Sequence, residues 1–110
     1  MGWIKTNLEG VWVFEPKIWH DQRGYFVETF NASTLPEELK DIHFVQDNQA
    51  QSSYGVVRGL HYQLAPFAQT KFIRVLSGTI LDVVVDIRIG SPTYGKTYTL
   101  ELSAENKLQL

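Results

Sequence analysis

One short stretch of the sequence combines an arginine, a glycine and a histidine, three residue types that could support proton-transfer chemistry. Residues 56–63 read Val-Val-Arg-Gly-Leu-His-Tyr-Gln. In a regular strand His61 faces the same side as Gly59, so the imidazole has space around it. A neutral imidazole accepts a proton well near neutral pH. Taken alone, however, the pattern favours a half-buried histidine that donates a hydrogen bond to a backbone carbonyl.

Polar residues in neighbouring segments strengthen the functional interpretation. Gln46 and Asn48 fall in one expected strand and Lys71 opens another, where a sandwich would place an apolar layer. Histidine, lysine and amide side chains together suit the removal of a proton next to a carbonyl group. The imidazole takes the proton, the ammonium stabilises the enolate oxygen, and arginines such as Arg58 hold an anionic part of the substrate.

A second candidate stretch runs from Asp21 to Glu28 and consists of a turn that leads into a strand. Arg23 and Glu28 are candidate polar contacts, and the ring of Phe26 is a candidate wall of a binding site. An arginine can grip a diphosphate through two parallel hydrogen bonds. A charged turn before a strand is also common on protein surfaces, so both interpretations stay open.

The composition and charge exclude several functional classes. The 110 residues are 44% apolar and carry 10 Lys and Arg against 12 Asp and Glu, which excludes disorder and a positive field that attracts nucleic acid. Cysteine is absent and His20 and His43 are isolated, so we expect no metal and no other cofactor. The sequence has neither an apolar run of 18 residues nor a signal sequence, so we expect no membrane span and a cytoplasmic location.

The elements that must position these residues are strands, because apolar residues recur mostly with period two and strand-forming types are concentrated in short runs. The length supports one domain, residues 1–110, with one core. The segment 31–41 is the exception, because Ser33 or Thr34 can cap a short helix near 32–40 with Pro36 in its first turn. The expected strands cover residues 10–14, 24–30, 43–52, 56–63, 71–76, 80–87 and 96–102.

The strand expected at 80–87 carries two aspartates among apolar residues. We expect its odd-numbered face to be core, because every residue on that face is apolar. The even-numbered face then turns to solvent or to a polar barrel interior. Asp86 is expected at the surface, with Arg88 and Lys96 available as exposed ion-pair partners, and Asp82 stays open between the two environments.

Much of the chain consists of short motifs in a fixed order: Arg23–Glu28, Phe44–Asn48, Val57–Gln63, Lys71 with Arg74-Val75, Asp82–Arg88, Gly90–Gly95 and Leu102–Asn106. In this order and spacing the motifs resemble the dTDP-4-dehydrorhamnose 3,5-epimerase family. The string Arg-Gly-Leu-His-Tyr-Gln is the one most typical of that family. A series of blocks in register is far more specific than any single motif.

The resemblance implies an all-β fold, a cupin-type antiparallel jelly roll, and a homodimer in which the N-terminal strand near Gly10–Phe14 crosses to the partner. It implies epimerisation of dTDP-4-keto-6-deoxyglucose at carbons 3 and 5 through enolates, on the route to dTDP-L-rhamnose, without a metal. By the same resemblance His61 corresponds to the base and Lys71 to the group that stabilises the enolate. The residues that correspond to substrate contacts are Arg23, Phe26, Glu28, Gln46, Asn48 and Arg58.

Members of that family continue beyond the segment Ala104–Lys107. Their further strands close the barrel and supply a proton-donating tyrosine and an aspartate that pairs with the histidine. We therefore expect the 110 residues to form an incomplete, N-terminal part of the jelly roll, truncated before the closing strands. Without that tyrosine and aspartate, we expect these 110 residues to exchange substrate protons about 100-fold or more slowly than a full-length member of the family, if at all. Two alternatives stay open: a 5-epimerase or ketoisomerase on the same scaffold, and a non-catalytic remnant that binds nucleotide sugars.

Overall fold

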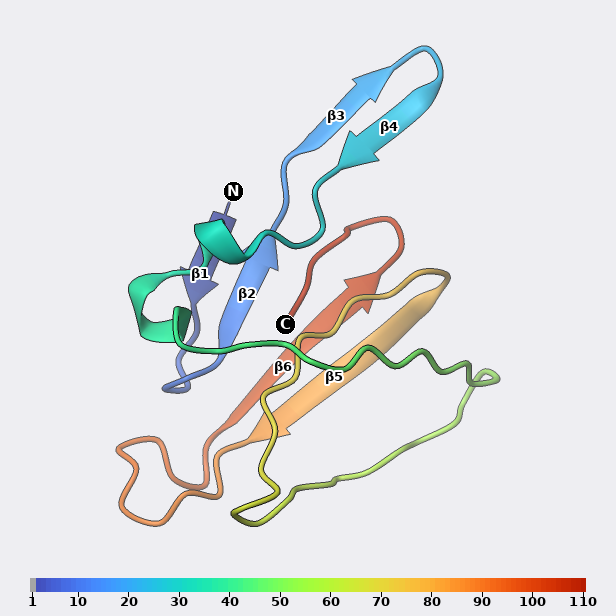
Figure 1. The fold of residues 1–110 in the computed structure, drawn as a ribbon. Helices are drawn as coiled ribbons and strands as arrows, with labels where there is room; N and C mark the ends of the chain where they lie inside the picture. Colours follow the sequence, from blue (N-terminus) through green and yellow to red (C-terminus); the bar gives the residue numbers. More distant parts are fainter. Residues whose placement is uncertain (1) are drawn as a thin grey trace.

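The computed structural model describes residues 2–110, which form six β-strands, two single 3-10 turns and no α-helix (Figure 1). The strands pair as three antiparallel hairpins, β1 with β2, β3 with β4 and β5 with β6. An all-β fold was expected, and this part of the prediction is confirmed. The bounds are β1 Gly2–Lys5, β2 Trp12–Glu15, β3 Ile18–Asp21, β4 Gly24–Val27, β5 Thr79–Val85 and β6 Thr97–Ser103, with 3-10 turns η1 Ala32–Thr34 and η2 Glu37–Leu39.

The end of the described chain ties β2 to the segment that precedes β5. Phe14 and Gln109 exchange two backbone hydrogen bonds of 2.8 and 3.0 Å, and Ile73 and Leu110 exchange two more of the same lengths. Residues 109 and 110 therefore lie between β2 and residue 73. This arrangement closes a small core in which Val13, Leu102 and Leu110 are buried.

The core face of β5 is the even-numbered one, so the expectation that the odd-numbered face is core was wrong. Val84 packs against the core, whereas Leu81 is 66% exposed. The register explains this, because Asp82 pairs with Leu100 and Val84 pairs with Tyr98, and both of these β6 residues also contact the core. The two aspartates on the even-numbered face pointed to solvent, but the face that packs inward is set by tertiary partners and not by the local pattern.

Three expected strands, at 43–52, 56–63 and 71–76, are not strands in the described chain. A strand requires hydrogen bonds to a neighbouring extended segment. In these three stretches only Ile73 forms such bonds, with Leu110. Residues 43–70 instead form a long irregular arch that leaves the β5–β6 hairpin and returns to it (Figure 1). Apolar alternation indicates extended backbone, but pairing depends on tertiary partners that the local pattern does not specify.

The short helix expected near 32–40 is present as two 3-10 turns. Its cap differs from the expectation: the side chain of Asn31, rather than Ser33 or Thr34, accepts the backbone N–H of Ser33 at 3.0 Å. Pro36 explains why two turns form instead of one helix. A proline disfavours helical backbone in the preceding residue, and Leu35 has an extended ψ of 137°.

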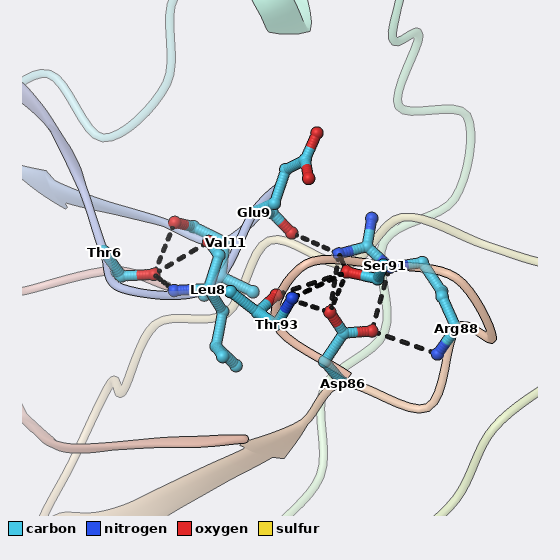
Figure 2. Close-up of polar contacts among 8 residues, drawn as sticks. All are labelled: Thr6, Leu8, Glu9, Val11, Asp86, Arg88, Ser91 and Thr93. Atoms are coloured by element: carbon cyan, nitrogen blue, oxygen red, sulfur yellow. Dashed lines mark hydrogen bonds and ion pairs between the residues drawn. The ribbon is translucent and has the colours of Figure 1, made fainter. Parts of the chain in front are cut away.

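Asp86, at the end of β5, is buried at 5% exposure, so its expected surface position was wrong. The expected partner is present, because the Arg88 guanidinium donates to both carboxylate oxygens at 3.0 Å (Figure 2). The hydroxyls of Ser91 and Thr93 each donate to Oδ2 at 2.6 Å. Arg88 also donates to the backbone oxygen of Glu9 at 2.7 Å, which links the β5–β6 loop to the β1–β2 loop.

The guanidinium of Arg88 and the two hydroxyls hold the pKa of Asp86 well below its usual range. Because this pKa is lower in the folded state, the stability it contributes is present above the ordinary aspartate pKa and is lost as the pH falls toward the lowered value. We expect Asp86→Ala to lower Tm by roughly 5–10 °C at pH 7, since it leaves two hydroxyls and a guanidinium without their acceptor. Thermal denaturation followed by circular dichroism measures the change.

The matched control for this variant is Asp41→Ala, which removes an exposed carboxylate. We expect its Tm to stay within about 2 °C of the wild type. The difference between the two variants should shrink in strong acid, where Asp86 becomes protonated in the wild type. Equal Tm values for both variants at pH 7 would contradict a stabilising role for the Asp86 network.

Candidate functional site

His61, the expected base, lies exposed on the irregular arch. The backbone of Gly59 is left-handed, with a φ of +101°. A Cβ built at Gly59 would lie 3.4 Å from the Nδ1 atom of His61, at van der Waals contact. The positive φ is the feature that favours glycine at this position.

Arg58 folds back onto the arch rather than reaching outward. Its Nε donates to the Ser52 hydroxyl at 2.9 Å, and its Nη2 donates to the backbone oxygen of Gln51 at 3.0 Å. A guanidinium has five N–H donors, so these two bonds leave further donors for an anion. The same contacts hold residues 51–58 as a loop around the arginine.

Gln46 and Asn48 lie on one side of the chain, as the period of two predicts. The side-chain amide of Gln46 donates to the Oδ1 atom of Asn48 at 3.2 Å. Both side chains are exposed. The pair presents the remaining amide N–H groups and the Gln46 carbonyl to a ligand that carries polar groups of both kinds.

Lys71 is exposed directly after the arch, and its charge acts on Asp82, a residue whose environment the sequence left open. Burial raises the pKa of Asp82, and the positive charge of Lys71 acts in the opposite direction by a smaller amount. The Oδ2 atom of Asp82 is buried and accepts no hydrogen bond from the described part of the chain. The sequence signal for a partly buried carboxylate was the position of Asp82 among apolar residues of one strand.

Three other predicted residues, Arg23, Phe26 and Glu28, belong to the β3–β4 hairpin or the residue that follows it. Arg23 lies in the turn with its side chain 90% exposed, and its Nη2 forms a 2.6 Å ion pair with Asp21. The Arg23 guanidinium lowers the pKa of the Asp21 carboxyl. Phe26 is 69% exposed beside its cross-strand partner Trp19.

The structure does not bring the two groups of predicted residues together within one chain. Figure 1 shows the β3–β4 hairpin at one end of the molecule, with the β5–β6 hairpin between it and the arch that carries His61. Gln46, Asn48, Arg58 and His61 share the arch, and Lys71 follows directly after it. Arg23 and Phe26 belong to the β3–β4 hairpin and Glu28 directly follows it, so these three residues lie apart from the arch. The roles expected for all eight residues stay predictions.

Two further properties of the described residues concern metals and membranes. Among residues 2–110, no three His, Cys, Asp or Glu side chains are grouped so that they could hold a metal ion. Within the same range, no helix has the length and apolar character needed to cross a membrane.

Comparison with known sequences gives one family over nearly the whole chain. The sequence profile described as dTDP-4-dehydrorhamnose 3,5-epimerase matches residues 5–110. The dTDP-4-dehydrorhamnose 3,5-epimerase of Shigella flexneri is 51% identical over 111 residues, which cover 100% of this chain and 61% of the relative.

Solved structures agree with this match. The dTDP-6-deoxy-D-glucose-3,5-epimerase of Legionella pneumophila, in complex with dTDP-4-keto-L-rhamnose, superposes with a TM-score of 0.88 at 48% identity, over 98% of this chain and 57% of that one. ChmJ, a 3'-monoepimerase from Streptomyces bikiniensis in complex with dTDP-quinovose, gives a TM-score of 0.88 at 37% identity, over 96% and 54%. The chain thus spans between about half and two thirds of the length of these proteins.

Proposed function

Because this chain belongs to the dTDP-4-dehydrorhamnose 3,5-epimerase family, we propose that it acts in the epimerisation of dTDP-4-keto-6-deoxyglucose at carbons 3 and 5. The observation that carries the proposal is the match over residues 5–110, which includes His61, Lys71 and every predicted substrate contact. The cupin-type jelly-roll relatives superpose over the same residues. We further propose, from the family membership, that the protein works in the cytoplasm.

The proposed chemistry needs only acid–base groups, because the 4-keto group already acidifies the hydrogens on carbons 3 and 5. His61 removes one of these protons with its neutral imidazole, and the electron pair of the C–H bond moves into the carbonyl to form an enolate. The ammonium of Lys71 stabilises the negative oxygen. An acid other than His61 must then give a proton to the opposite face of the carbon, which inverts its configuration, and His61 must lose its own proton to solvent before the same steps repeat at the second carbon.

The diphosphate and nucleotide need cations and polar groups, for which Arg58, Gln46 and Asn48 are available on the same arch as His61. Donors left free on Arg58 suit a diphosphate oxygen. The amide pair of Gln46 and Asn48 suits the polar edges of a sugar or a base. These residues would hold the substrate so that its keto sugar lies between His61 and Lys71.

The remaining contacts are proposed to come from a second copy of the chain in a homodimer. The β3–β4 hairpin projects from the molecule and exposes Trp19, Phe26 and the Arg23 guanidinium (Figure 1). The strand expected to cross to the partner, at Gly10–Phe14, instead has a neighbour on each side within its own chain, since β2 pairs with β1 and bridges to Gln109. We therefore assign the exchange to β3–β4.

The decisive experiment is deuterium wash-in from heavy water into dTDP-4-keto-6-deoxyglucose, read by NMR at carbons 3 and 5, with dTDP binding measured by calorimetry. Exchange at both carbons is the expected result. Exchange at one carbon only would favour a single-site epimerase. The likeness to ChmJ, a 3'-monoepimerase, is the reason to test for this outcome. Binding of dTDP without exchange would identify a non-catalytic sugar-nucleotide binder. The absence of both binding and exchange would overturn the proposal.

A further inference from the structure

Lys107, in the turn after β6, has a backbone conformation that is unusual for its residue type. Its φ is +54°, and among residues 2–110 no other residue except glycine has a positive φ. The left-handed region is strained for a residue with a long side chain and is usually occupied by glycine or asparagine. Strain of this kind persists only where the surrounding structure imposes it, and it often marks a position whose side chain has a function.

The hydrogen bonds of the turn impose this conformation. The side-chain oxygen of Asn106 accepts the backbone N–H groups of Ser103 and Leu108, each at 3.0 Å. The Ser103 hydroxyl accepts the backbone N–H of Asn106 at 2.9 Å, and the Ser103 carbonyl accepts that of Lys107 at 3.0 Å. Because these bonds fix the backbone on both sides of Lys107, the turn sets the direction in which the lysine side chain leaves the backbone.

The ammonium of Lys107 lies over the ring of Tyr25 in β4. Its Nζ atom is 4.3 Å from the ring centroid and also donates to the backbone oxygen of Ala104 at 2.5 Å. A cation within about 6 Å of the centroid of an aromatic face is attracted by that ring. Figure 1 shows the turn after β6 directly below the β3–β4 hairpin. The side chain of Lys107 therefore joins the turn to the hairpin.

The β3–β4 hairpin depends on such contacts, because among residues 2–110 it pairs with no other strand. Tyr25 and Val27, on one face of β4, line a small pocket with residues of the C-terminal segment. Just after β4, the buried side-chain amide of Gln109 donates to the backbone oxygen of Thr29 at 3.0 Å. The hairpin is thus held at its base by Gln109 and nearer its turn by Lys107.

The face of the hairpin that Lys107 contacts determines which face stays free. Successive side chains of a strand alternate between its two faces, so Phe26 lies opposite Tyr25. Its cross-strand partner Trp19 shares this free face. Phe26 and Trp19 are 69% and 57% exposed. The hairpin can therefore be anchored to its own chain through one face while the other is available to a ligand or a second chain.

We propose that Lys107 is a positioning residue that holds the Tyr25 face of the hairpin against its own chain. The opposite face with Phe26, and the turn with Arg23, are thereby presented to the nucleotide in a fixed direction. A binding group that is already fixed loses less entropy when the ligand arrives. The inference rests on the proposed function for its meaning in nucleotide binding, but the contact between Lys107 and Tyr25 does not.

The contact is tested by NMR of the chain without nucleotide. A methylene group held over an aromatic ring resonates upfield, so the ε-protons of Lys107 should lie upfield of those of exposed Lys96. Tyr25→Phe keeps the ring and should keep this shift. Tyr25→Leu should abolish it and leave the shift of Lys17, whose Nζ lies 3.8 Å from the centroid of the Trp19 ring in the same hairpin. Resonances of Lys107 at the position of Lys96 in the wild type would overturn the proposal.

Positioning is tested by dTDP affinity, measured by calorimetry, and by kcat for deuterium exchange. Lys107→Met should weaken dTDP binding about 2- to 5-fold and leave kcat within about twofold, because His61 and Lys71 lie on another part of the chain. Lys107→Arg keeps a cation over the ring and should bind as the wild type does. The control Lys96→Met removes an exposed ammonium and should also bind normally.

A further variant separates the side chain from the strained backbone. Lys107→Gly relieves the strain but removes the ammonium, so it should weaken dTDP binding to the same extent as Lys107→Met. Wild-type affinity in both variants would overturn the positioning role. If the wild type binds no dTDP while the upfield shift is present, the proposed function fails and the contact between Lys107 and Tyr25 stands.

Discussion

Replacement of His61 by asparagine is expected to reduce deuterium exchange at carbons 3 and 5 of dTDP-4-keto-6-deoxyglucose by about 100-fold or more. Asparagine keeps a polar side chain of similar size but has no basic nitrogen, so it cannot take the proton. Substrate affinity should change little, because the imidazole acts on the reacting carbon and not on the nucleotide. Exchange is read by NMR in heavy water, and dTDP affinity by calorimetry.

The matched control is His43→Asn, which changes another exposed histidine and should leave exchange at the wild-type rate. Lys71→Ala should weaken exchange by a smaller factor than His61→Asn, since it removes the stabilisation of the enolate oxygen but leaves the base. Wild-type exchange in His61→Asn would show that the base is a different residue.

Truncation of Leu102 to alanine is expected to destabilise the chain by about 2–5 kcal/mol. Leu102 is fully buried, at 0% exposure, and its neighbours in the core are Val13 and Leu110. A loss of this size is a large share of the roughly 5–15 kcal/mol that stabilises a typical domain. Urea denaturation followed by circular dichroism should therefore show a much lower midpoint or no cooperative transition.

The control for this variant is Leu81→Ala, which makes the same chemical change on the opposite face of the same hairpin. Leu81 is 66% exposed, so its truncation should alter stability by only about 0.5 kcal/mol. Equal losses for the two variants would mean that the β5–β6 hairpin also packs through its odd-numbered face, contrary to the structure.

Local signals in the sequence predicted one of the three hairpins. The break at Gly90-Ser91-Pro92 separates β5 from β6, as expected, whereas β1 and β3 were not among the expected strands. The turn at Asp21–Gly24 was expected to lead into a strand, and that strand is β4. A turn depends on a few adjacent residues, so its position can be predicted without knowing the tertiary contacts. The pairing of residues 43–76 was not predictable in the same way, since it depends on segments distant in sequence.

The site was predicted by residue type and by family resemblance rather than by geometry. His61 has space around it because the whole segment that carries it is exposed. The inward direction of Asp82 depends on which face of β5 packs, and Arg88, the partner of buried Asp86, also contacts the distant residue Glu9. Neither of these is encoded in the local alternation of apolar and polar residues.

The separation of Arg23 from His61 has a genetic consequence. If each binding site combines the hairpin of one chain with the arch of the other, a chain with Arg23→Ala and a chain with His61→Asn are defective in different halves of the site. A mixed dimer of the two then contains one site built from both intact halves and one built from both damaged halves. Two alleles that are each inactive alone would complement each other when expressed in the same cell, and a single chain carrying both substitutions would complement neither.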